Sequence, residues 1–231
     1  MKLKVKPNQV AVELSGDNAC FAQYTSGINR YTSNIPTASA LAGMLNSIYA
    51  HPHDKYDKDE DQSNRNLLEK PRKNFKWVID KIYIQKPIKF YSYSYNARKD
   101  FSGEAKTGSG TSKIIPVTDI ILQDVSYVVI AHPHIFEKRE NNTYQKHVSI
   151  FNRRVKEGKC FHQPTFGLAN YPASFKEVPE EIKVENINML VYDYLLDMEY
   201  TEAGSVIPKR IPVIEVKNGI VDVEKCRKEE K

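Results

Sequence analysis

A lysine and a histidine stand side by side in the segment Tyr144-Gln145-Lys146-His147, where a helical apolar pattern begins. Histidine exchanges a proton near neutral pH, whereas lysine carries a fixed positive charge. A cation can hold a phosphate while the imidazole moves a proton, so the two residue types together suit phosphate chemistry. Adjacent Lys and His residues on a helix are more often two solvated polar side chains. The dipeptide alone therefore does not establish a catalytic site.

The helix that carries this pair is predicted from apolar residues at positions i, i+4, i+7 and i+11, which are Tyr144, Val148, Phe151 and Val155. Gly158 is its expected stop. Lys146 and His147 lie off this stripe. Successive helix residues diverge by about 100°, so the two side chains could line opposite walls of one groove.

The bulk composition gives a modest basic excess, with a net charge of +5 and 27% charged residues. This excess does not by itself require a polyanionic partner. The three cysteines are odd in number and widely spaced, which predicts reduced thiols and no disulfide framework. The first residues are basic without a following apolar region, and no apolar run is long enough to span a bilayer. We therefore predict a cytoplasmic protein with no membrane association.

The distribution of charge says more than its total. Acidic residues concentrate at 54–61 and 177–185, which leaves local basic groups at 70–76, 98–99 and 153–159. Such groups form a phosphate-contacting surface if the fold brings them together, and otherwise they are solvated faces. We predict five RNA-binding residues: Arg98, Lys99, Arg153 and Arg154 from these groups, and Lys113 outside them.

The order of predicted elements indicates an α+β fold with an antiparallel sheet. A strand is expected at 8–14 and a helix from Pro36-Thr37, with apolar residues at helical spacing and Tyr49 at its end. Further strands are expected at 76–96, 120–130, 188–193 and 213–216, and 224–231 reads as a charged tail. Glycines 103, 108 and 110 mark a hairpin tip or loop.

Three tyrosines, Tyr91, Tyr93 and Tyr95, alternate along the segment 76–96 and would share one face of a strand. They could stack on RNA bases, or they could form an aromatic ladder packed against neighbouring structure. The sequence leaves these two readings open.

Two His-Pro-His triplets could in principle supply metal ligands: His51 and His53 in the first, His132 and His134 in the second. Two imidazoles spaced by two in an extended segment point to the same side. However, no cysteine or carboxylate spacing joins them into a metal-binding pattern, and the prolines are simply explained as loop punctuation. We predict no metal and no cofactor.

Several segments in order resemble the CRISPR-associated Cas-five proteins, in particular those of type I-C that process CRISPR precursor RNA. The matching segments are 35–49, 77–87, Lys146-His147, 158–164, Phe166-Gly167, 171–175 and 189–193. They extend through nearly the whole chain. One departure stands out, since Leu168-Ala169-Asn170 replaces a Cys-Arg-Glu-like segment that relatives often have, which puts RNA contacts at this loop in doubt.

The resemblance implies a ferredoxin-like (RRM-like, RAMP) domain with an inserted β-hairpin in residues 1–180, and a C-terminal antiparallel β region with a charged tail in residues 181–231. It also implies a subunit of the type I-C Cascade complex that holds the 5′ handle of the CRISPR RNA beside the backbone and large subunits. The family's catalytic tyrosine, lysine and histidine match Tyr49, Lys146 and His147 here.

The activity implied is metal-independent cleavage of the repeat hairpin of the precursor RNA by attack of a ribose 2′-hydroxyl on its own 3′ phosphate. His147 would act as general base or acid, Lys146 would stabilise the charged phosphorane, and Tyr49 would orient the nucleophile or assist proton transfer. A free tyrosine is a better proton donor than base at neutral pH, but the sequence does not assign base and acid. The alternative is a non-catalytic scaffold that only binds the RNA handle.

Overall fold

The computed structural model of the chain describes residues 1–21, 30–49, 75–99, 113–135, 144–167, 170–200 and 206–229. Its elements follow the order β1 (Val10–Ala19), β2 (Arg30–Tyr31), α1 (Ala38–Ile48), β3 (Phe75–Ile84), β4 (Lys89–Lys99), β5 (Lys113–Ile135), α3 (Tyr144–Lys156), β6 (Ser174–Lys176), β7 (Met189–Tyr200), β8 (Val206–Lys217), β9 (Ile220–Asp222) and α4 (Val223–Glu229).

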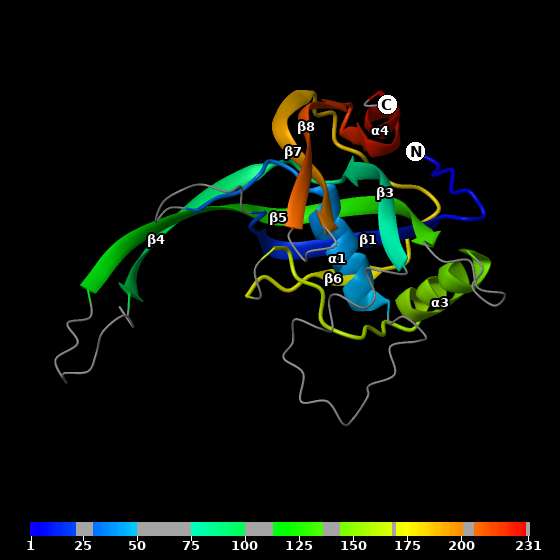
Figure 1. The fold of residues 1–231 in the computed structure, drawn as a ribbon, viewed down its shortest axis with the longest axis horizontal. Coiled ribbons are helices and arrows are strands. Elements are labelled where there is room, and N and C mark those ends of the chain that lie inside the picture. Colours follow the sequence, from blue (N-terminus) through cyan, green and yellow to red (C-terminus); the bar gives the residue numbers. More distant parts are fainter. Residues whose placement is uncertain are drawn as a thin grey trace.

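One curled sheet contains all nine strands of the described residues (Figure 1). Its main path is β6-β1-β5-β3-β9-β8-β7, and every neighbouring pair along this path is antiparallel. Helices α1 and α3 pack against the sheet, with α1 on β3 and β7 and α3 on β5 and β1. The predicted α+β class with an antiparallel sheet is therefore confirmed.

Strand β5 is the longest element, and its two halves have different partners. Its first half pairs with β4 over Lys113–Gln123, and its second half pairs with β1 and β3. The β4–β5 hairpin extends away from the body of the molecule (Figure 1). The strand begins well before residue 120, where it was predicted, and it includes Pro116. A proline is tolerated there because this part of β5 lies outside the main path of the sheet.

Helix α1 forms as predicted, because Thr37 caps its start and its apolar residues share one face. The Thr37 side chain accepts a hydrogen bond from the Ala40 amide at 3.2 Å. The buried face consists of Ala38, Leu41, Met44, Leu45 and Ile48. The helix ends at Tyr49, whose backbone is extended and whose amide donates to Leu45.

Helix α3 also forms where it was predicted, but its buried face differs at the first position. Val148, Phe151 and Val155 are buried, whereas Tyr144 is 43% exposed. His147 is buried instead, one turn before Phe151 on the same side of the helix. The expectation that both Lys146 and His147 lie off the apolar face was therefore wrong for His147. Gly158, at φ 63°, ends the helix as expected.

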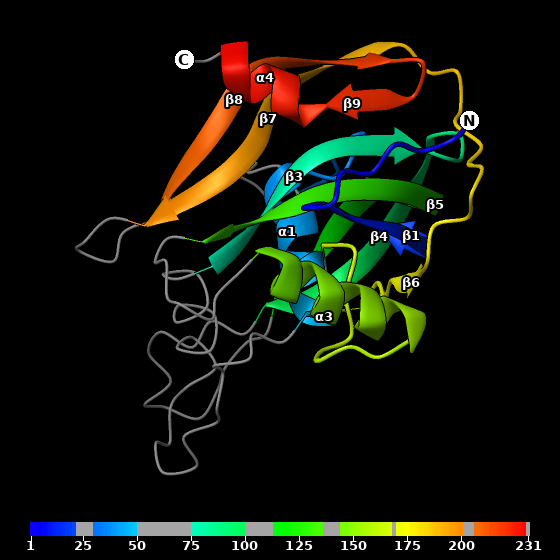
Figure 2. The same ribbon diagram turned by 90° about the vertical axis from the view of Figure 1, so that its right-hand side faces the viewer.

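The C-terminal segment continues the sheet. Asn218 and Gly219 both have positive φ and form the tight turn between β8 and β9. Helix α4 spans Val223–Glu229, so most of the segment 224–231 that was predicted to be a charged tail is helical, and Val223 at the start of the helix is fully buried. Helix α4 follows β9 directly (Figure 2). It packs along β3, and the Arg227 side chain donates to the Ile79 carbonyl at 2.6 Å. Strand β9 pairs with β3, so the sheet includes strands from both sides of residue 180. The domain boundary at residue 180 stays a prediction.

Buried side chains form two clusters on the two faces of the sheet. The larger cluster lies between the sheet and helices α1 and α3, and it includes Trp77, Ile79, Val129 and Ala131. The smaller cluster contains Tyr83, Val128 and Ile130, which alternate with the first set along β3 and β5. No helix in the described parts of the chain is long and apolar enough to cross a membrane.

Candidate active site

Tyr49 is placed by the end of helix α1 and by two aromatic side chains. Its ring meets Trp77 of β3 edge-on, with 5.6 Å between ring centroids, and Trp77 in turn packs on Phe151 of α3 at 5.0 Å. Such edge-to-face contacts fix ring orientation as well as burying apolar area. The phenol ring is only 3% exposed. Tyr49 is thus held rigidly between α1, β3 and α3.

His147 lies in the first turn of α3 and contacts Tyr49 directly. The distance from the Tyr49 hydroxyl oxygen to His147 Nδ1 is 2.5 Å, although the two residues are 98 positions apart. His147 is only 1% exposed. The structure therefore joins two of the three predicted catalytic residues in a buried hydrogen bond.

Lys146 leaves the helix on another side from His147, because adjacent helix residues diverge by about 100°. Lys146 is exposed, whereas His147 is buried. The first turn of α3 contains no acidic residue. The first backbone N–H groups of a helix have no partner within the helix, and together with the positive end of the helix dipole they favour an anion at such a position. Lys146 adds a positive charge to that end of the helix.

The predicted RNA-binding residues fall into two separate places. Arg153 lies two helical turns after Lys146 on α3, which puts the two residues about 10 Å apart on one side of the helix. Arg153 is exposed and Arg154 is partly exposed. The backbone of Arg98, Lys99 and Lys113 lies at the far end of the β4–β5 hairpin, and their side chains lie outside the described part of the structure.

The predicted tyrosine face of the hairpin is seen in part. Tyr91 and Tyr93 of β4 are 46% and 51% exposed, and the Tyr95 side chain lies outside the described residues. Half-exposed rings favour the reading in which this face is open to a ligand over a fully packed aromatic ladder. Leu168 and Ala169, where the sequence departs from the family pattern, also lie outside the described residues.

The second His-Pro-His triplet has a carboxylate partner that the sequence did not reveal. His132 Nδ1 lies 2.9 Å from Oδ1 of Asp80, which is buried in β3. A single acidic residue between Ile79 and Lys81 gave no signal for this contact. His51 and His53 lie outside the described residues, and within those residues no three His, Cys, Asp or Glu side chains gather to hold a metal.

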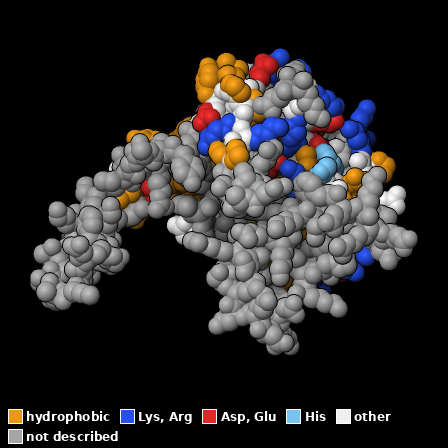
Figure 3. All heavy atoms as spheres, viewed as in Figure 1, with side chains coloured by type: hydrophobic (Ala, Val, Ile, Leu, Met, Phe, Trp, Pro, Cys, Tyr) orange, Lys and Arg blue, Asp and Glu red, His pale blue; other side chains and the backbone are white. Residues whose placement is uncertain are grey.

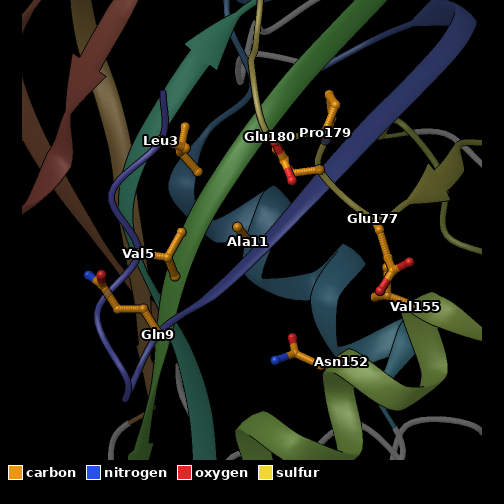
Figure 4. A pocket seen from close by; sticks show the side chains of 10 residues that line it. Leu3, Val5, Gln9, Ala11, Asn152, Val155, Glu177, Pro179 and Glu180 are labelled. Atoms are coloured by element: carbon orange, nitrogen blue, oxygen red, sulfur yellow. The ribbon is translucent and has the colours of Figure 1, made fainter. Parts of the chain in front are cut away.

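A cavity of about 350 Å³ lies elsewhere, between the N-terminal segment, α3 and residues 177–180 (Figure 4). Its wall combines apolar side chains such as Leu3 and Val155 with the carboxylates of Glu177 and Glu180. Carboxylates repel phosphate, and neither Tyr49 nor His147 lines this cavity. It is therefore distinct from the candidate active site.

Residues 10–206 match the sequence profile of a family described as CRISPR-associated protein (Cas_Cas5), in its Cas5d form. This match covers most of the chain, so the chain belongs to the CRISPR-associated Cas5d family. The family predicted from the sequence is thereby confirmed.

Two curated relatives share the name CRISPR pre-crRNA endoribonuclease Cas5d. The protein of Mannheimia succiniciproducens is 29% identical over 94% of this chain and 95% of its own length. The protein of Thermus thermophilus is 23% identical over 84% of this chain and 75% of its own. Among solved structures, a CRISPR-associated protein has a similar fold, with a TM-score of 0.60, 16% identity, and coverage of 96% of this chain and 93% of that one.

Proposed function

We propose that this protein is a metal-independent endoribonuclease that cuts the repeat hairpin of CRISPR precursor RNA and stays bound to the 5′ handle of its product. The observation that carries the proposal is the buried contact between the Tyr49 hydroxyl and His147 Nδ1. It joins two groups that can exchange protons, beside a helix end that favours phosphate. Both curated relatives are named as endoribonucleases of CRISPR precursor RNA, which supports the proposed substrate and the proposed RNA cleavage.

The strand order supports a ferredoxin-like (RRM-like, RAMP) domain as part of this proposal. The elements β1, α1, β3, β5, α3 and β6 follow the βαββαβ order, and their strands lie side by side as β6-β1-β5-β3. The β4–β5 extension would then be the inserted hairpin, and β7 to α4 the C-terminal region.

In the proposed reaction, a ribose 2′-oxygen gives up its proton and bonds to the adjacent phosphorus, and the bond to the 5′-oxygen breaks. The 5′-oxygen takes up a proton, which leaves a 2′,3′-cyclic phosphate and a 5′-hydroxyl. When His147 is protonated on both ring nitrogens, Nδ1–H donates to the Tyr49 hydroxyl oxygen and Nε2–H can protonate the leaving oxygen. When only Nδ1 carries a proton, Nε2 is free to act as the base.

Lys146 is proposed to stabilise the phosphorane together with the first N–H groups of α3. These donors and the lysine charge would meet the negative charge that develops on the phosphate oxygens. Arg153, on the same side of the helix, would hold a neighbouring phosphate of the strand, and Arg98, Lys99, Lys113 and Arg154 would add further backbone contacts.

A non-catalytic scaffold that binds the RNA handle is the second candidate, and the burial of the site favours it. Tyr49 and His147 are only 3% and 1% exposed, so a phosphate must displace neighbouring atoms to reach Nε2. In either case, the proposed partners are the precursor RNA and the backbone and large subunits of a type I-C Cascade complex, in the cytoplasm.

The deciding experiment incubates the purified protein with its repeat hairpin RNA in excess EDTA. One substrate is all-ribose, and the other carries a 2′-deoxy nucleotide immediately upstream of the cut. We expect cleavage of the ribose substrate alone, with a 2′,3′-cyclic phosphate end. An intact ribose hairpin that is nevertheless bound tightly would favour the scaffold, and cleavage of the deoxy substrate would exclude attack by the 2′-hydroxyl.

The same assay tests Lys146 against a matched lysine. We expect Lys146→Gln to slow cleavage by about 10- to 100-fold at saturating protein, because it removes a charge that acts on the transition state. The control is Lys183→Gln, since Lys183 is exposed and pairs with Glu185 at 2.9 Å. Equal rates for both variants would remove Lys146 from the site.

A further inference from the structure

Asp80 is a buried acid at an irregularity in the sheet. Strands β3 and β5 pair Ile79 with Ala131 and Lys81 with Ile130, so Asp80 is the extra residue of a β-bulge. The residue is 1% exposed. β-bulges are frequent beside functional sites because they redirect a side chain. Here the bulge directs a carboxylate toward His132 on the neighbouring strand.

The Asp80 carboxylate fixes the orientation of His132. Its two oxygens lie 2.9 and 3.0 Å from His132 Nδ1, and Gln9 Nε2 donates to Oδ2 at 2.6 Å. A carboxylate only accepts hydrogen bonds, so Nδ1 must carry the proton. Nε2 is then the ring atom that can meet a ligand, and no side chain in the described parts of the chain bonds to it. The His132 side chain is 32% exposed, which leaves that edge accessible.

Charged groups surround this histidine on every neighbouring element. Lys76 of β3 pairs with Asp197 of β7, and Arg227 of α4 interacts with both Asp80 and Asp197. Glu224 of α4 interacts with His132 and pairs with Lys6 and Lys228. On β5, burial lowers the pKa of His134, and the charges of Lys76 and His132 lower it further. Figure 3 shows histidine side chains at the surface among Lys and Arg side chains.

This balance of charge favours an anion over a metal ion. The nearby acids Asp197 and Glu224 already have lysine partners. The guanidinium of Arg227 uses one N–H group on the Ile79 carbonyl and has others. When the ring of His132 is protonated, its Nε2–H adds a further donor that points outward.

We propose that His132, oriented by Asp80, binds a backbone phosphate of the RNA on the face of the sheet opposite to the Tyr49–His147 pair. Trp77 of β3, which packs on Tyr49, is paired with Pro133 of β5, and His132 is the residue before Pro133. His132 lies on the same side of β5 as Val128 and Ile130, whereas Trp77 belongs to the cluster under the helices. The RNA would therefore contact both faces at one end of the sheet. This inference rests on the proposed RNA-binding function.

The test measures binding without cleavage, using the hairpin RNA with a 2′-deoxy nucleotide at the cut. Two variants separate a binding role from a structural one. His132→Asn keeps an amide near the position of Nδ1, which can still donate to Asp80, but it lacks the outer nitrogen. His132→Gln places an amide near the position of Nε2. The control is again Lys183→Gln, which removes a charge from an exposed lysine.

We expect His132→Asn to weaken RNA binding by about three- to tenfold and to reduce the slope of log affinity against log salt by about 1. The wild-type affinity should also fall more than that of His132→Asn as the pH is raised, because only a protonated ring donates from both nitrogens. His132→Gln should restore part of the affinity, and all variants should melt cooperatively.

The possible failures are distinguishable. Tight wild-type binding with an unchanged affinity and salt slope in His132→Asn would overturn the inference and leave the proposed function intact. A lower melting temperature with unchanged binding would assign the dyad a purely structural role and would also overturn it. Absence of RNA binding by the wild type would overturn the proposed function itself.

Discussion

The contact between Tyr49 and His147 decides which ring nitrogen of the histidine is left to meet a substrate, because it occupies Nδ1. A tyrosine hydroxyl is both a donor and an acceptor, so it can remain bonded to Nδ1 whether or not Nδ1 carries the proton. The same two residues can therefore serve an acid step and a base step. The ability to act as both acid and base depends on the hydrogen bond between Tyr49 and His147. It does not depend on the exposed Lys146.

Removing the Tyr49 hydroxyl tests this role. In Tyr49→Phe the ring remains packed on Trp77, but His147 Nδ1 loses its partner in a buried position. We expect a loss of about 1–3 kcal/mol of unfolding free energy and at least about a tenfold slower cleavage with an altered pH–rate profile. Single-turnover rates and thermal melts of the same samples provide both measurements.

His147→Ala is the reference for that variant. It should slow cleavage by about 10²- to 10⁴-fold, the usual contribution of a general acid or base. If Tyr49→Phe is destabilised but cuts at the wild-type rate with an unchanged pH profile, the hydrogen bond serves only folding. If His147→Ala cuts normally, the site lies elsewhere.

At the residue scale, the sequence did not show that Tyr49 and His147 lie in contact. Only the family resemblance linked the two residues, because no spacing rule joins positions that are 98 apart, and their catalytic role stays a prediction. The burial of His147 could have been inferred from its place one turn before Phe151, but a histidine beside a lysine was read as polar. The contact of Asp80 with His132 was not predicted, because a β-bulge that has no sequence signature redirects the Asp80 side chain.

At the scale of elements, the two long helices were predictable, and the ends of the strands were not. A cap residue and a 3.6-residue period determine α1 locally. By contrast, the 23 residues of β5 include Pro116 and positions with different partners, so no single alternation pattern covers them. Helix α4 was read as a tail because its burial depends on β3, a distant element.

Gly167 offers a test of how the segment after α3 is attached to β1. Its φ is +87°, and a Cβ atom there would lie 1.8 Å from the Cys20 carbonyl oxygen. The neighbouring Phe166 carbonyl accepts the Cys20 amide at 3.0 Å, so the two segments cannot separate without losing a hydrogen bond. We expect Gly167→Ala to lower the unfolding free energy by about 2 kcal/mol or more, measured by denaturant titration.

Gly43 in the middle of α1 is the matched control. A Cβ atom there meets nothing within 4 Å. Gly43→Ala should therefore raise stability by about 0.5–1 kcal/mol, because alanine loses less backbone entropy in a helix. Equal effects of the two substitutions would show that the close approach at Gly167 is not maintained in solution.

At the scale of the whole molecule, the C-terminal strands complete the core that α1 begins. The main buried cluster includes Leu41 and Leu45 of α1 together with Leu196 and Ile214 of β7 and β8. The buried Tyr194 hydroxyl donates to the Pro36 carbonyl at 3.1 Å, just before α1 begins. The boundary predicted at residue 180 came from the family resemblance, which does not show the contacts that the two parts share.

The final prediction is that residues 1–180 do not fold independently of residues 181–231. Without β7, the apolar face of α1 that packs on it would be exposed, and without β9, β3 would lose a neighbouring strand. We expect the full chain to melt in one cooperative transition and the 1–180 fragment to show none by circular dichroism. A 1–222 variant, which lacks only α4, should melt cooperatively at a lower temperature, because it keeps β9 and loses the bond from Arg227 to Ile79. A sharp transition of the 1–180 fragment near that of the full chain would instead identify two independent domains.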